Sequence, residues 1–221
     1  MLPDQSELAR SLLSAYDTQL REQTELLSAA QVDRDGPLWR GTFGTRGFVS
    51  YRDLGGLTGA ALDDLIARTI LFFASNEQII SFEWKTRGHD APSDLPERLI
   101  AQGFRAEETE TVMLGEARLL AQHVPLPAGV KLRRIDDQPE PLPDLIRAAA
   151  AQERAFGAAF GVQDFVRHLE SGRGRTELWV AEVQGNVICT GRLEVVPGTE
   201  FAGLWGAARC PSGGVGAFTA P

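Results

Sequence analysis

Three consecutive segments in the second half of the chain decide its fold: TELWVAEV (176–183), NVICTGRLEVV (186–196) and TEFAGLWG (199–206). β-branched and aromatic residues are frequent in all three, which is typical of strands. The short connections QGN (184–186) and PG (197–198) contain turn-forming residues. Because strands joined by such short turns run in opposite directions, the three segments are predicted to form an antiparallel meander.

The residues before the meander complete a domain of mixed structure. The segment KLRRI (131–135) predicts a short strand. A helix is then predicted from the apolar spacing between Leu145 and Phe156, and a second helix contains Phe165 and ends at Gly172. The predicted order is therefore strand, helix, helix and a meander of three strands.

The first half of the chain opens with helix and hairpin signals. Asp4 and Glu7 have capping-box spacing, and the apolar residues that follow predict a long helix to about Ala29. The segments PLWRGTF (37–43) and RGFVSYRD (46–53) then predict a hairpin with a short loop.

Further elements are expected between this hairpin and the middle of the chain. A helix with a wide apolar stripe should begin after Thr58, and the alternation in residues 80–85 predicts a central strand. Capping-box spacing of Asp94 and Glu97 predicts a short helix, and ETVMLGE (110–116) predicts another strand.

Breaks in periodicity suggest where the domains begin and end. The passage VPLPAG (124–129) contains two prolines and a glycine and ends all periodicity. It predicts an amino-terminal domain of residues 1–123, a linker of residues 124–130 and a carboxy-terminal domain of residues 131–206. After Gly206 the sequence changes abruptly to AARCPSGGVGAFTAP, which shows no periodicity.

Composition restricts the classes of function. The chain has 221 residues, of which 30 are acidic and 22 basic, giving a net charge of -8. This balance disfavours a nucleic-acid-binding surface. No run of about 20 apolar residues is present, and residues 1–4 lack the features of a signal peptide, so we expect a cytoplasmic protein with no membrane partner. Two cysteines and three scattered histidines offer no metal-site spacing, and no metal is expected.

The order of elements in the second half, and three stretches in the first, resemble the GCN5-related N-acetyltransferase (GNAT) family. The stretches DLGGLTGAALDDLIART (53–69), FEWKTRGHDAPSDLPERLIAQGF (82–104) and ETETVML (108–114) are similar to the amino-terminal region of a two-domain subgroup. The resemblance covers roughly residues 50–206. It implies an α/β fold of the acyl-CoA N-acyltransferase type with mixed α+β sheets, in which a degenerate amino-terminal copy precedes an incomplete carboxy-terminal copy.

The resemblance also implies a cofactor site. In the family, acetyl-CoA lays its pantetheine arm along the fourth strand, here 199–206, so Leu204, Trp205 and Gly206 are the expected cofactor-binding residues. A loop of pattern Arg/Gln-x-x-Gly-x-Gly/Ala should follow and hold the pyrophosphate with its backbone amides. The segment SGGVG (212–216) has no Arg or Gln before it, so the chain departs from the family at this loop.

A change of reading frame would explain the departure. Residues 210–221 can be back-translated with permitted codons so that a two-base shift reads Pro-Glu-Trp-Arg-Gly-Arg-Gly-Val-Tyr-Arg-Ala, which resembles the missing loop. We therefore hypothesise that residues 207–221 are a frame-shifted tail and that this truncated form has little or no activity. Without a fifth strand, the fourth would remain an exposed edge, which a second copy in a homodimer would cover.

The resemblance implies direct acetyl transfer from acetyl-CoA to an amine on a small molecule or peptide. Glu194 and Glu200 are the carboxylates nearest the expected thioester, and each is either a general base or a solvated strand residue. Phe156 and Phe160 either line the substrate pocket or pack in the core. The family's late-helix tyrosine has no counterpart here, so no general acid is assigned.

The alternative function is a non-catalytic binding or interaction module. In that case the amino-terminal domain and its first helix would carry the function. Neither the acceptor nor the oligomeric state is specified by the sequence, and whether the chain acts as an enzyme stays open at this stage.

Overall fold

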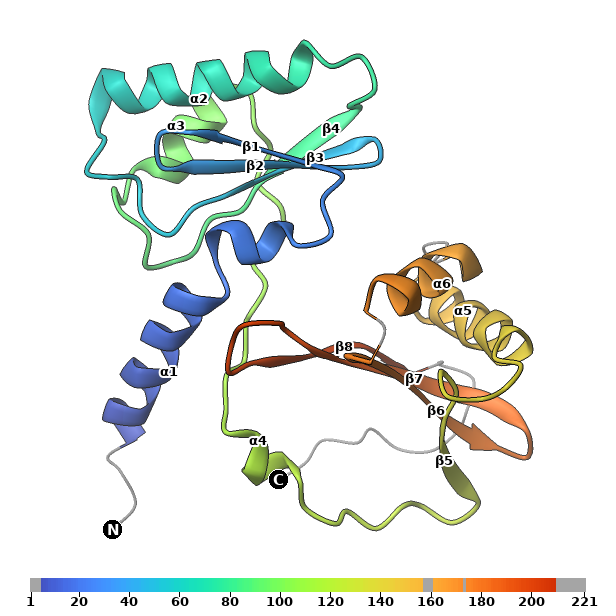
Figure 1. The fold of residues 1–221 in the computed structure, drawn as a ribbon. Helices are drawn as coiled ribbons and strands as arrows, with labels where there is room; N and C mark the ends of the chain where they lie inside the picture. Colours follow the sequence, from blue (N-terminus) through green and yellow to red (C-terminus); the bar gives the residue numbers. More distant parts are fainter. Residues whose placement is uncertain (1–4, 157–160, 173, 210–221) are drawn as a thin grey trace. The chain divides into compact units, whose positions relative to one another are not determined.

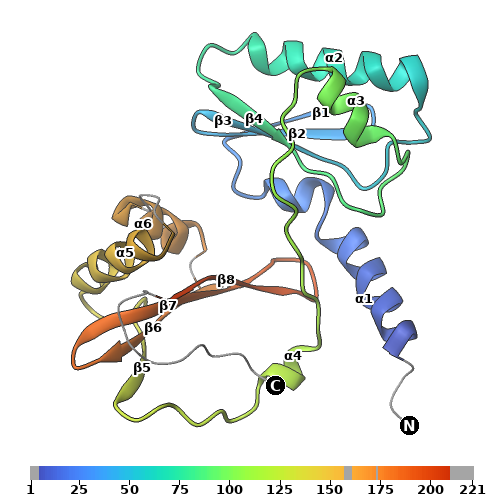
Figure 2. The same ribbon diagram turned by 180° about the vertical axis from the view of Figure 1, so that it is seen from behind.

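The computed structural model describes residues 5–156, 161–172 and 174–209. The chain divides into two compact units, Met1–Leu120 and Ala121–Pro221. Figures 1 and 2 show that each unit has its own sheet and its own helices.

The first unit begins with two short helices in place of the single long helix predicted to Ala29. Helix α1 spans Gln5–Gln19, and a 3-10 helix, η1, spans Glu22–Leu26. Between them, Arg21 has an extended backbone and Glu22 has a φ of 57°. The prediction was wrong because Arg21 leaves the helix to form buried hydrogen bonds, donating from Nε to the carbonyl oxygen of Tyr51 and from Nη2 to Asp90 Oδ1.

A sheet of four strands forms the middle of this unit, in the order β1-β2-β3-β4. Its strands are β1 (Gln31–Asp35), β2 (Leu38–Phe43), β3 (Arg46–Ser50) and β4 (Ser81–Trp84). The predicted hairpin is confirmed as β2 and β3, whereas β1 was not predicted. Strand β4 pairs with β3 in parallel and lies at the edge of the described sheet, so the prediction of a central strand was wrong.

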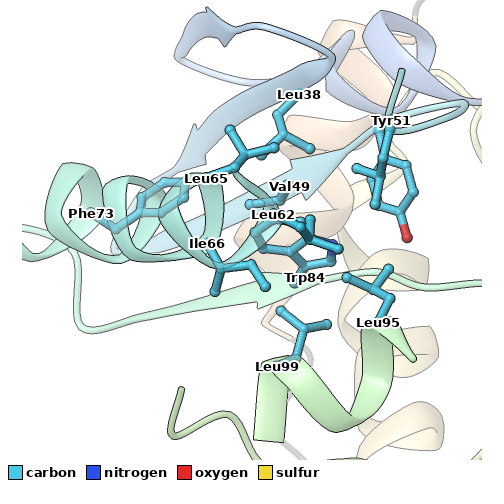
Figure 3. Packing of buried hydrophobic residues seen from close by; sticks show 11 residues of the cluster. Leu38, Val49, Tyr51, Leu62, Leu65, Ile66, Phe73, Trp84, Leu95 and Leu99 are labelled. Atoms are coloured by element: carbon cyan, nitrogen blue, oxygen red, sulfur yellow. The ribbon is translucent and has the colours of Figure 1, made fainter. Parts of the chain in front are cut away.

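Helices α2 (Gly59–Ala74) and α3 (Leu95–Ala101) build the core of the first unit with the sheet. Both helices were predicted, although neither Thr58 nor Asp94 makes a side-chain capping bond. Figure 3 shows leucines of α2 and α3 gathered around Trp84 of β4. Helix α2 lies directly on the sheet at Gly47, where an added Cβ would be 2.4 Å from the ring of Phe73.

The segment after α3 is irregular. Residues 110–116, predicted as a strand, form neither helix nor strand, and Met113 is 91% exposed. The prediction failed because a short apolar run alone does not make a strand, which also needs a neighbouring strand for its backbone hydrogen bonds. A four-residue helix, α4 (Ala117–Leu120), ends the unit.

The second unit has the predicted order of strand, two helices and meander. Strand β5 spans Val130–Arg134, and the helices are α5 (Leu142–Phe156) and α6 (Val162–Ser171). The meander consists of β6 (Thr176–Val183), β7 (Asn186–Val195) and β8 (Ala202–Arg209). All neighbouring strands of the sheet β5-β6-β7-β8 are antiparallel.

Both helices of the second unit lie over one face of its sheet (Figures 1 and 2). The core between them contains Leu145 from α5 with Leu178 and Val180 from β6. Strand β8 starts later than the segment quoted from the sequence and continues to Arg209. The first three residues of the predicted tail, 207–209, therefore extend β8, and its other residues lie outside the described part of the chain.

Candidate functional site

The candidate site is an irregularity in β8, the last strand of the described second sheet. Trp205 pairs with Arg192 of β7, whereas Ala208 pairs with Thr190, so the register changes by one residue between these pairs. Gly206 lies within the bulge and has a φ of 64°, a left-handed conformation that glycine adopts at low cost. The bulge therefore interrupts the ladder at a residue expected to contact acetyl-CoA.

Two buried polar side chains support the bulge. Thr190 Oγ1 donates a hydrogen bond to the carbonyl oxygen of Gly206 at 3.1 Å, and Gln152 of α5 donates from Nε2 to Thr190 Oγ1 at 3.2 Å. A Cβ on Gly206 would lie 2.7 Å from that Nε2. Helix α5 thus holds the irregular segment of β8 through a chain of hydrogen bonds, and a side chain at position 206 would require the Gln152 amide to move.

Glu194 lies close to this segment, two residues after Arg192 on β7. Its side chain is 37% exposed, and its Oε2 is 3.5 Å from the Nε of Arg192. Burial lowers the pKa of the Arg192 guanidinium, and the carboxylate of Glu194 partly opposes this effect. Glu194 pairs in register with Gly203, three residues before Gly206, and its predicted role as a base that acts directly or through water stays a prediction.

The other predicted site residues lie at different places. Glu200 is exposed and precedes β8. Leu204 and Trp205 are both exposed strand residues whose side chains alternate between the two faces of the sheet. Phe156 is the last residue of α5, and Phe160 lies outside the described residues, so their predicted role in a pocket stays a prediction.

Sequence reasoning missed the three polar residues closest to the site. Gln152 follows four consecutive alanines in α5, and Thr190 and Arg192 alternate with other residues along β7. All three lie on the side of their element that faces the core. A polar residue on an otherwise apolar face was the signal that could have identified them.

The first unit contains a charged cluster of a different character. Asp90 accepts hydrogen bonds from Arg21, from the Tyr51 hydroxyl at 2.6 Å and from the backbone N–H of Arg87. Burial and the neighbouring carboxylate of Asp90 raise the pKa of Tyr51 well above its usual range. Tyr51 therefore stays protonated as a donor to Asp90, which is a structural role.

Metal-binding groups and membrane-spanning helices are absent from the described residues. No group of three or more His, Cys, Asp or Glu side chains in that part of the chain is arranged to hold a metal ion. None of the described helices combines the length and apolar character needed to cross a membrane.

Solved structures identify the fold. No protein-family model and no curated protein sequence matches the chain. The structure of a GCN5-related N-acetyltransferase from Kribbella flavida matches with a TM-score of 0.53 at 13% sequence identity. The match covers 96% of this chain and 75% of that chain.

The chain has a GNAT fold. This confirms the predicted fold class, with its mixed α/β architecture. A second structure is the carboxy-terminal DUF2156 domain of a protein named as a lysylphosphatidylglycerol synthetase from Agrobacterium fabrum. It matches with a TM-score of 0.36 at 11% identity, covering 95% of this chain and 70% of that chain.

Proposed function

We propose that the second unit binds acetyl-CoA along β8 and transfers its acetyl group to an amine of a small molecule or peptide. The observation that carries this proposal is the bulge at Gly206, supported by Gln152 and Thr190, in the last described strand of a GNAT fold. The outer edge of such a strand offers backbone donors and acceptors to a pantetheine amide. Leu204, Trp205 and Gly206 are the residues proposed to contact the cofactor.

The chemistry requires few protein groups. The neutral amine nitrogen forms a bond to the acetyl carbonyl carbon, the carbon–sulfur bond breaks, and the thiolate of coenzyme A leaves and takes a proton. A backbone N–H at the bulge would stabilise the negative charge that develops on the carbonyl oxygen. Glu194 is the proposed base for the ammonium proton because it is half-exposed and close to Arg192, the register partner of Trp205.

We further propose that the chain in its present form transfers acetyl slowly or not at all. Residues 207–221 lack the Arg/Gln-x-x-Gly-x-Gly/Ala pattern, and a shifted frame can restore it. Without that loop, the pyrophosphate loses the amide donors that would hold it. The nucleotide sequence across the codons of residues 206–221 tests this directly, because a shifted frame that does not spell the loop removes the frameshift hypothesis.

Thermal denaturation with and without millimolar acetyl-CoA tests the binding site. A ligand that binds only the folded state raises the melting temperature, so the present chain should show a small rise and a frame-restored version a larger one. Gly206→Ala should abolish the rise because its Cβ would displace Gln152. Gly198→Ala is the matched control, since Gly198 also has a positive φ but has open space around it.

The same measurement addresses the alternative function. If neither the present chain nor the frame-restored version responds to acetyl-CoA, the acetyl-transfer proposal fails. A non-catalytic binding module that depends on the first unit would then be the better description.

A further inference from the structure

The strongest further observation concerns Arg192, a partly buried cation at the candidate site whose Nε is buried. In the register of the second sheet, Arg192 lies between Leu178 of β6 and Trp205 of β8. Leu178 packs in the core beneath α5, and residues directly opposite each other on neighbouring strands share a face. The Arg192 side chain therefore emerges on the helix-covered face, where it is 15% exposed.

Arg192 has few partners for a guanidinium that is mostly covered. Its buried Nε has no hydrogen-bond partner among the described residues, since Glu194 Oε2 lies 3.5 Å away without hydrogen-bond geometry. The Trp205 ring centroid is 6.0 Å from its central carbon, a weak cation–π distance. A buried charged donor without a partner is unfavourable, and native proteins retain such groups where a ligand completes the site.

The geometry indicates what kind of group would complete it. A guanidinium presents parallel N–H donors that match the two oxygens of a carboxylate. The nearby carboxylate of Glu194 would repel a dianionic phosphate but would attract an ammonium group. Arg192 and Glu194 together thus suit a molecule that has one carboxylate and one amine.

The two side chains are also placed next to the proposed thioester. Trp205, the register partner of Arg192, immediately precedes Gly206 in the bulge. The Trp205 indole lies back over Gly203, where an added Cβ would be 2.3 Å from its Nε1. A carboxylate held by Arg192 would bring the attached amine close to Glu194 and to the bulge at the same time.

We infer that the acceptor is an amino acid or another amine that bears a carboxylate, and that Arg192 binds this carboxylate and sets the specificity of the site. This inference rests on the proposed acetyl transfer for its catalytic meaning, but binding of the carboxylate does not depend on acetyl-CoA. Arg192 is thus a specificity residue, and Glu194 takes the proton of the acceptor ammonium.

Calorimetric titration of the full chain tests the inference without any need for turnover. The probes are the standard L-amino acids and their carboxamides, which retain the amine and lose the negative charge. At least one amino acid should bind the wild-type chain about 10- to 100-fold more tightly than its carboxamide, as expected for charged hydrogen bonds. Arg192→Met should remove this difference and Arg192→Lys should restore part of it.

A matched control is Arg134→Met, which removes an arginine from β5, two strands away from β7 in the same sheet. It should leave the preference for the carboxylate unchanged. If Arg192→Met fails to fold, the comparison of acid and carboxamide on the wild-type chain still decides the matter. Equal affinity for both, no binding of any amino acid, or unchanged preference in Arg192→Met would each overturn the inference.

The outcomes also separate this inference from the proposed function. One outcome is that the chain binds an amino acid through Arg192 but its frame-restored version does not bind acetyl-CoA. That outcome would support the carboxylate site and contradict the acetyl-transfer proposal. The opposite outcome is that acetyl-CoA binds but the amino acid and its carboxamide bind equally well. That outcome would support the acetyl-transfer proposal and contradict the carboxylate site. In a frame-restored version that is active, Arg192→Met should raise KM for the amino acid with a smaller effect on kcat.

Discussion

Two arginines, one buried and one partly buried, show how differently the two units use charge. In the first unit, Arg21 has a side chain that is 1% exposed and donates to Asp17, Asp90 and the carbonyl oxygen of Tyr51. In the second unit, the Arg192 side chain is 15% exposed, and its buried Nε has no hydrogen-bond partner among the described residues. A fully paired arginine holds segments of a fold together, whereas an incompletely paired one is available to a ligand.

The largest effect should come from breaking the paired arginine. Arg21→Met would leave Asp90 buried without its cation, which costs about 3–5 kcal/mol of unfolding free energy. Arg192→Met should cost less than about 1 kcal/mol, because Glu194, its ionic neighbour among the described residues, is half-exposed. Urea unfolding of both variants, followed by circular dichroism, measures the difference. Equal losses in the two variants would contradict the comparison.

A second test concerns the bulge beside Arg192. Gly206→Ala should lose about 2 kcal/mol, because the new Cβ combines backbone strain with a clash against Gln152. Gly198→Ala should lose only the strain, about 1 kcal/mol. Adding Gln152→Ala to Gly206→Ala should recover part of the loss, and strictly additive losses in this double-mutant cycle would rule out the clash.

A smaller loss is expected at Thr190. Thr190→Val removes the hydroxyl that links Gln152 to the carbonyl oxygen of Gly206, which should cost about 1–2 kcal/mol and weaken acetyl-CoA binding. Thr190→Ser retains the hydroxyl and should preserve binding of acetyl-CoA. If thermal shifts show that the serine variant binds as poorly as the valine variant, the hydrogen bond is not what positions β8.

The smallest effect sharpens the comparison within the second unit, where Arg133 is paired with the carboxylates of Asp144 and Glu182. Hydrogen bonds from Arg133 hold the pKa of Asp144 and of Glu182 below their usual values. A depressed folded-state pKa gives stability that is present above the unfolded pKa, near 4, and lost as the pH falls through the folded pKa. The Asp144→Asn variant should therefore lose about 1 kcal/mol less unfolding free energy than the wild-type chain when the pH falls below 4. Unfolding curves from pH 7 to pH 2 would measure this, and identical pH profiles would contradict it.

Much of the fold could be predicted because periodicity and packing agree. The apolar stripe of α2 and the short turns that join β6, β7 and β8 predicted elements that now line the two cores. The errors arose where a long-range contact decided the local structure. Arg21 ends α1 because it pairs with Asp90, which lies 69 residues further along the chain. No local sequence pattern indicates so distant a partner.

The site was less predictable than the fold. Gly206 was expected to contact the cofactor, and it lies within the bulge, but a bulge is a relation between two strands and has no signature in one of them. Gln152, Thr190 and Arg192 become neighbours of the site only when α5, β7 and β8 pack together. Their spacing in the sequence gave no reason to group them.

The contact between Gly47 and Phe73 has a consequence for how this protein can change over evolutionary time. Since the phenylalanine ring occupies the space that a side chain at position 47 would need, neither residue can be replaced freely on its own. In distant relatives, a larger residue at the first position should be accompanied by a smaller one at the second. Pairs of this kind would link the crossover helix to its sheet in any alignment deep enough to detect covariation.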